Sequence, residues 1–180
     1  MDIEEEILAV RSKDHVHTLV MWVGKDKRRF HQLMEYFLHG EEPLAKKTAW
    51  IIGHCTELHP SLAAPWLKPM LKKMHENVVH GAVKRNIMRI LQFVDIPRSL
   101  QGNVASLCFN LISSINEPIA VRTFSMTVLA NIAKHEPDLY QELDLTVRQM
   151  LPYATPAFRA RAKKTLKNRE NIERREIPED

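Results

Sequence analysis

Glycine is scarce in this sequence, with 5 residues in 180, and aromatic residues make up only 7%. A β-rich chain of this length would need more turn glycines and more β-branched runs, so the shortage argues against a sheet protein. It also leaves no room for a glycine-rich phosphate loop. The 2 cysteines, Cys55 and Cys108, both lie in apolar segments with helical character. We therefore expect buried free thiols rather than a disulfide framework.

Long apolar runs are also missing, since the uncharged apolar stretches are well short of a membrane span. The first residues are acidic, and no apolar segment of the signal-peptide kind follows them. The net charge of +4 permits an acidic partner without demanding one. From these features we expect a cytoplasmic protein without membrane contact.

What the sequence does contain is a regular spacing of residues that begin helices. Pro43, Gly81, Pro118 and Pro156 each precede an apolar helical pattern, at intervals of 38, 37 and 38 residues. Proline is tolerated in the first turn of a helix, where its missing N–H would have no partner. A fixed period of this size indicates a stacked array of helical repeats.

Aligning the four segments predicts the buried face of each helix. Apolar or small residues recur six and ten positions after the proline or glycine, and this spacing of four places them on one face. These residues are Ala49, Gly53, Ile87, Leu91, Phe124, Val128, Ala162 and Leu166. An amphipathic partner helix precedes each segment, over residues 27–39, 65–76, 100–114 and 139–151.

These patterns predict an all-α fold, a right-handed α-α superhelix of four to five helical hairpins in a single domain. We place an N-terminal capping repeat at 1–26, repeats at 27–60, 65–97, 99–136 and 138–169, and a charged tail at 170–180. Val121-Arg122 after Glu117-Pro118 resembles the HEAT-like branch of the armadillo/HEAT α-solenoid family. The resemblance implies a concave repeat surface and a role as a protein-binding scaffold.

Residues for catalysis or metal binding do not form a recognisable motif. His54, Cys55 and His59 are clustered, but neighbouring residues diverge by about 100° on a helix and do not share a ligand face. We expect no catalytic residues, no metal site and no cofactor, and we read the chain as a non-enzymatic module.

Basic residues on the second helices offer an alternative function. Stacked repeats would align them into a concave stripe able to follow a phosphate backbone, although a solvated helix face, with some arginines packing between repeats, is the simpler explanation. The stripe consists of Lys47, Lys84, Arg85, Arg89, Arg122, Arg159 and Arg161. Protein and nucleic acid therefore remain the two candidate partners.

Aromatic residues in the first half of the chain bear on the same alternative. There is a weaker similarity to HEAT-like DNA alkylation repair proteins, in which aromatic and acidic side chains hold a damaged nucleotide. On that analogy Trp22, Trp50 and Asp26 would be the relevant positions. Core packing is the simpler explanation for the tryptophans. Gly24 predicts a helix end just before Asp26, which would place Asp26 in a turn.

Overall fold

The computed structural model describes residues 2–76 and 79–176. All the regular secondary structure in these ranges is α-helix or 3-10 helix, and none of the residues described forms a strand. The chain divides into two compact units, Met1–Ile96 and Pro97–Asp180. The boundary between the units lies between Ile96 and Pro97, inside the end of the repeat predicted at 65–97.

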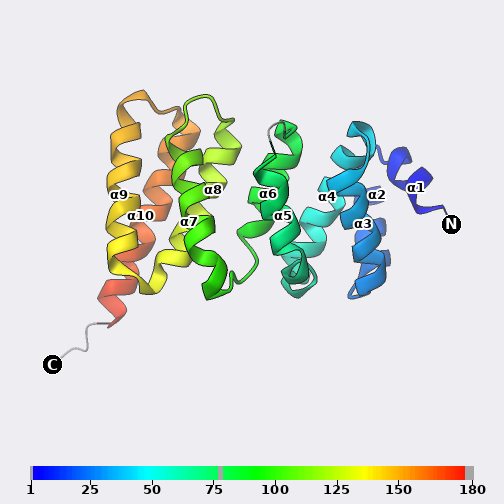
Figure 1. Ribbon diagram of the computed structural model, residues 1–180, viewed down its shortest axis with the longest axis horizontal. Coiled ribbons are helices and arrows are strands. Elements are labelled where there is room, and N and C mark those ends of the chain that lie inside the picture. Colours follow the sequence, from blue (N-terminus) through cyan, green and yellow to red (C-terminus); the bar gives the residue numbers. More distant parts are fainter. Residues whose placement is uncertain (1, 77–78, 177–180) are drawn as a thin grey trace. The chain divides into compact units, whose positions relative to one another are not determined.

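Helix α4 is central to the first unit, because α1, α2, α3 and α6 all pack against it. The core of the first unit is formed by large apolar side chains, including Phe30, Phe37, Ile51, Ile52 and Met88, which are almost fully buried. The unit contains α1 (Ile3–Ala9), α2 (Lys13–Val23), α3 (Lys27–His39), α4 (Glu42–Leu58), α5 (Leu67–Met74) and α6 (Gly81–Leu91), with short 3-10 turns at Pro60–Leu62 and Ala64–Trp66 (Figure 1).

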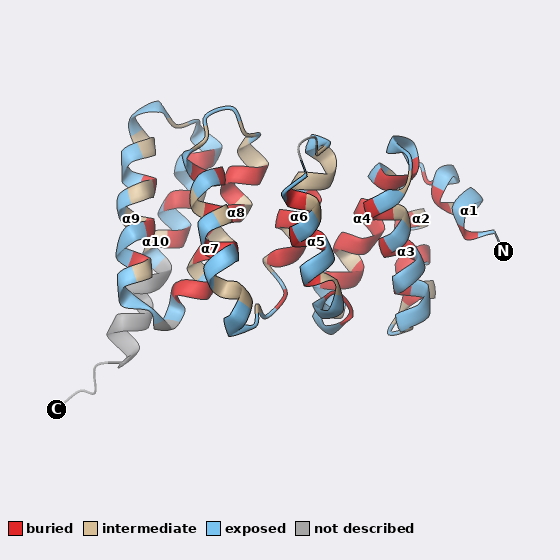
Figure 2. Cartoon of the chain, in the orientation of Figure 1, coloured by how far each residue is buried: buried red, intermediate tan, exposed pale blue. Residues whose placement is uncertain are grey.

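In the second unit, α7 packs against α8 and α9, and α10 packs against α8. Val104, Cys108, Met126, Leu143 and Phe158 are fully buried between these helices. The elements are α7 (Arg98–Ser113), α8 (Ile119–Ile132), α9 (Pro137–Met150) and α10 (Pro156–Glu176), with 3-10 turns at Ala133–His135 and Leu151–Tyr153. Figure 2 shows buried residues recurring along one side of the helices, as amphipathic helices require.

Local signals set the helix boundaries. Gly24 ends α2 in a conformation with φ of 49°, which residues other than glycine rarely adopt. The side chain of Asp26 then accepts hydrogen bonds from the first turn of α3. Pro43 lies in the first turn of α4, and Pro118 immediately precedes α8. These positions agree with the sequence prediction.

The predicted all-α hairpin array is confirmed, and most of the predicted buried face is buried. Six of its eight positions lie in the core, whereas Phe124 and Leu166 are only half-buried. The helix predicted at 65–76 begins with a 3-10 turn and becomes α5 at Leu67. The helix α10 continues to Glu176, past the predicted start of the charged tail, of which 177–180 lie outside the described residues. None of the described helices is both long and apolar enough to cross a membrane.

Candidate functional site

The basic residues predicted in the first unit are mostly engaged within the unit itself. The ammonium of Lys47 on α4 donates to the carbonyl of Leu8 at the end of α1. Desolvation by burial, followed by the nearby charge of Arg11, lowers the pKa of Lys47. Lys84 is half-buried on α6, whereas Arg85 beside it is exposed. Arg85 is thus the member of this group with the most surface for a partner.

Arg89 forms a close ion pair between two helices of the first unit. Its Nη2 lies 2.6 Å from Oε1 of Glu57 on α4. The guanidinium of Arg89 rests against α4 at Gly53, where a Cβ atom built on the glycine would lie 3.4 Å from the guanidinium carbon, an ordinary van der Waals contact. Burial raises the pKa of Glu57, but Arg89 and, to a smaller extent, His54 together outweigh it and leave that pKa below its usual value. The arrangement ties α6 to α4.

Among the basic residues predicted in the second unit, Arg122 is buried, with 5% of its surface exposed. Its Nε donates to the carbonyl of Ile112 at 3.0 Å, and its guanidinium lies 4.6 Å from the ring centre of Phe158. Desolvation lowers the pKa of Arg122. The side chain joins α8 to α7 and α10, and it offers little surface to a ligand.

Arg161 and Arg159 lie on α10 and differ in their exposure. The half-buried Arg161 donates from Nη1 to Oγ1 of Thr127 on α8, at 2.8 Å. The exposed Arg159 donates from Nε to the carbonyl of Ala154, at 3.1 Å. Lys163 and Lys167 are also exposed and follow Arg159 at intervals of four residues, which places the three on one helix face. We call Arg159, Lys163 and Lys167 the α10 basic face.

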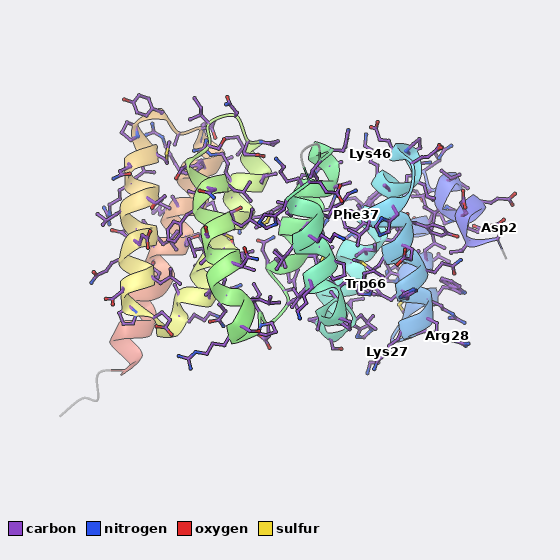
Figure 3. All side chains as sticks on the ribbon, in the orientation of Figure 1. Asp2, Lys27, Arg28, Phe37, Lys46 and Trp66 are labelled. Carbon is purple, nitrogen blue, oxygen red and sulfur yellow. The ribbon has the colours of Figure 1, made fainter. Side chains whose placement is uncertain are left out.

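The side chains of Trp22 and Asp26 come together around Arg29. The guanidinium of Arg29 lies 4.6 Å from the ring centre of Trp22, and its Nε lies 3.6 Å from Oδ2 of Asp26. Asp26 Oδ1 accepts from the backbone N–H groups of Arg28 at 2.8 Å and Arg29 at 3.2 Å. Trp50 is half-buried on α4. Asp26 thus has a structural role as the N-terminal cap of α3, where Lys27 and Arg28 project outward in Figure 3.

We expect the stability of the α3 N-terminus to depend on the charge of Asp26. The N–H groups of Arg29 and Arg28 lower the pKa of Asp26, so its stabilising contribution is present above the ordinary pKa of about 3.9 and is lost as the pH falls through the folded value. The amide signals of Arg28 and Arg29 should follow this titration by NMR. Asp26→Asn retains an acceptor but cannot titrate, so a transition that persists in this variant would contradict the assignment.

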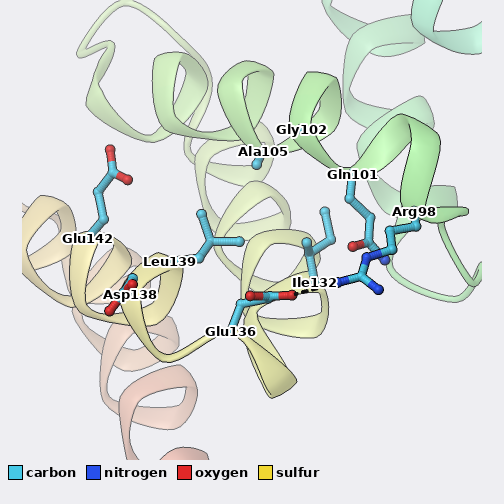
Figure 4. A pocket seen from close by; sticks show the side chains of 9 residues that line it. All are labelled: Arg98, Gln101, Gly102, Ala105, Ile132, Glu136, Asp138, Leu139 and Glu142. Atoms are coloured by element: carbon cyan, nitrogen blue, oxygen red, sulfur yellow. Dashed lines mark ion pairs between the residues drawn. The ribbon is translucent and has the colours of Figure 1, made fainter.

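Sequence reasoning missed a groove in the second unit, formed by α7, the end of α8 and the start of α9. Its walls include Gly102 and Glu142, and Ile132 lies at its base (Figure 4). The signal available in the sequence was the acidic set Glu136, Asp138 and Glu142, but nothing in its spacing indicated that α7 lies opposite.

Neither a reactive thiol nor a metal-binding cluster is found among the described residues. Cys55 and Cys108 are buried, and desolvation raises the pKa of Cys55 to about 12 and also raises that of Cys108. Both therefore stay protonated and unreactive near neutral pH. No group of three or more His, Cys, Asp or Glu side chains that could hold a metal ion occurs in the part of the chain that is described.

Comparisons with known proteins identify the repeat family. No curated protein and no solved structure matches the chain. A family model described as a HEAT repeat domain matches residues 3–169, which includes α1 to α9 and much of α10. The paired helices and their buried stripes are the arrangement that such repeats require. The chain therefore belongs to the HEAT repeat family.

Proposed function

We propose that the chain is a non-enzymatic scaffold that binds a protein partner on the open faces of its helical repeats. The HEAT repeat assignment over residues 3–169 carries the proposal. Stacked helix pairs bury one face of each helix against neighbouring repeats and leave extended surfaces for binding. The two units both follow this plan, with apolar cores and charged outer faces.

The test is partner capture with the full-length chain, followed by reconstitution from purified components. We expect at least one captured protein to bind the chain saturably when both are purified, and an unlabelled copy of the chain to compete. A captured protein that binds the chain only non-saturably after purification would not count as a partner. If no captured protein forms a saturable complex, the scaffold proposal is wrong.

A second candidate function, nucleic-acid binding, is favoured by the α10 basic face. Arg159, Lys163 and Lys167 are exposed, as is Lys164 beside them. Clustered basic side chains attract a phosphate backbone and release its counterions. In the first unit Arg85 is the exposed member of the predicted stripe. If the chain binds nucleic acid, a relationship to HEAT-like DNA alkylation repair proteins is a further hypothesis.

We expect reversal of the α10 basic face to Glu at positions 159, 163 and 167 to abolish most nucleic-acid affinity. Each lost phosphate contact should reduce the slope of log affinity against log salt by about 0.9 for duplex DNA. The measurement is fluorescence anisotropy with labelled DNA and RNA, at about 50 and 200 mM salt.

The matched control reverses three exposed lysines of the first unit, Lys13, Lys25 and Lys27, to Glu and so makes the same change in net charge. It should retain the salt slope of the unmodified chain. Equal losses in the two triple variants would show that net charge alone drives binding. Affinity that does not fall with rising salt would exclude phosphate contacts and leave the protein scaffold as the function.

A further inference from the structure

The groove between α7 and α9 is an open hollow of about 420 Å³ on the surface of the second unit. Its apolar surface comes from Ala105 and Ile132, which are buried, and from the half-buried Leu139. The groove is thus large enough to take a side chain of a partner, and its base is able to pack against aliphatic carbon.

The glycine in the α7 wall is not explained by the fold. Gly102 lies inside a regular helix, where glycine is less favourable than alanine. Its φ is not positive, and a Cβ atom built on it would meet no heavy atom within 4 Å. Neither backbone geometry nor packing therefore requires glycine at this position. Its effect is to keep the wall of the groove open.

The rim of the groove is acidic. Glu136, Asp138 and Glu142 lie on the α9 side, opposite a single cation, Arg98 (Figure 4). Arg98 Nη2 lies 3.7 Å from Oε1 of Glu136, but its side chain is 91% exposed and is free to move away. Asp138 and Glu142 form no ion pair with any side chain that the structure describes. The rim therefore has an excess of negative charge.

We propose that this groove binds the arginine or lysine side chain of a partner protein. The aliphatic stem would lie on Leu139 and Ile132, and the charged group would reach the carboxylates of Asp138 and Glu142. Basic side chains combine these two properties, because they bury their methylene stems while their charged ends bind carboxylates. The inference rests on the proposed scaffold function and specifies the chemistry that one of its surfaces recognises.

The test is an NMR titration of the full chain with the peptide acetyl-Ala-Leu-Arg-Leu-Ala-amide. We expect saturable shifts of the amide signals of Gly102 and Leu139. A peptide with citrulline in place of arginine has nearly the same shape without the charge, and it should bind at least about tenfold more weakly. A lysine peptide shows whether the groove requires the planar guanidinium or only a positive charge.

Two variants, each with a control, test the shape of the groove and its negative charge separately. Gly102→Leu fills the groove from α7 and should abolish the shifts without lowering the melting temperature, because leucine favours a helix and the space is open. Asn103→Leu adds the same side chain at an exposed neighbouring position and should bind normally. Asp138→Asn with Glu142→Gln should weaken binding about tenfold or more, whereas Glu5→Gln in the first unit should not.

Three results would overturn the inference: no saturable shift at about 10 mM peptide, equal binding of the citrulline peptide, or normal binding by Gly102→Leu. The scaffold proposal is tested separately by capturing partners with Gly102→Leu. If the variant retains every partner that the unmodified chain binds, the groove is not the docking site but the scaffold proposal stands. If the unmodified chain binds neither peptide nor protein, both proposals fail.

Discussion

Replacing Phe37 with alanine is expected to lower the free energy of unfolding by about 3–5 kcal/mol, the cost of emptying a phenylalanine site in a well-packed core. Phe37 lies on the face of α3 that packs against α4, and none of its surface is exposed (Figure 3). The substitution removes most of the side chain and leaves a cavity that the surrounding helices fill only in part. Urea unfolding followed by circular dichroism measures the loss.

The matched control is Phe93→Ala in the same unit, where the side chain is 40% exposed. Two-fifths of the residue's surface is already in contact with water, so we expect a smaller loss of about 1–2 kcal/mol. The slope of the free energy against urea concentration should be the same for both variants. Similar losses at the two positions would mean that α3 does not contribute to the core as described.

The sequence predicted the helices well because their ends depend on local chemistry. The helix predicted at 27–39 is α3, and its start follows from Asp26 while the end of the helix before it follows from Gly24. The four-residue spacing also identified at least one buried position on each second helix, as at Ile87. It does not determine how wide that face is, which is why Phe124 is only half-buried.

The candidate sites were harder to predict because they depend on neighbours that are distant in the sequence. The groove exists because the first two turns of α9 lie opposite α7, which brings Glu142 and Gly102 to one groove. The spacing of residues along the chain does not show which turns of α7 and α9 lie opposite each other. Likewise, helical periodicity placed Arg122 on a basic stripe, whereas the structure turns its side chain towards Ile112 and Phe158.

The placement of Arg122 leads to the second large expected effect. We expect Arg122→Ala to lower the free energy of unfolding by about 2–4 kcal/mol, because it removes the hydrogen bond to the carbonyl of Ile112 and the contact with Phe158. Arg159→Ala removes the same type of side chain from an exposed position and should change stability by about 0.5 kcal/mol or less. Urea unfolding of both variants makes the comparison.

Nucleic-acid affinity then distinguishes a structural role of Arg122 from a role in binding. Arg122→Met keeps much of the apolar contact with Phe158 and should lose less stability than Arg122→Ala, which leaves enough folded protein for binding assays. At equal folded concentration, we expect this variant to bind DNA as the unmodified chain does, because the buried guanidinium reaches no phosphate. If folded Arg122→Met loses affinity as strongly as reversal of the α10 basic face does, Arg122 must reach the ligand. Binding would then require a rearrangement of α8 that frees its side chain.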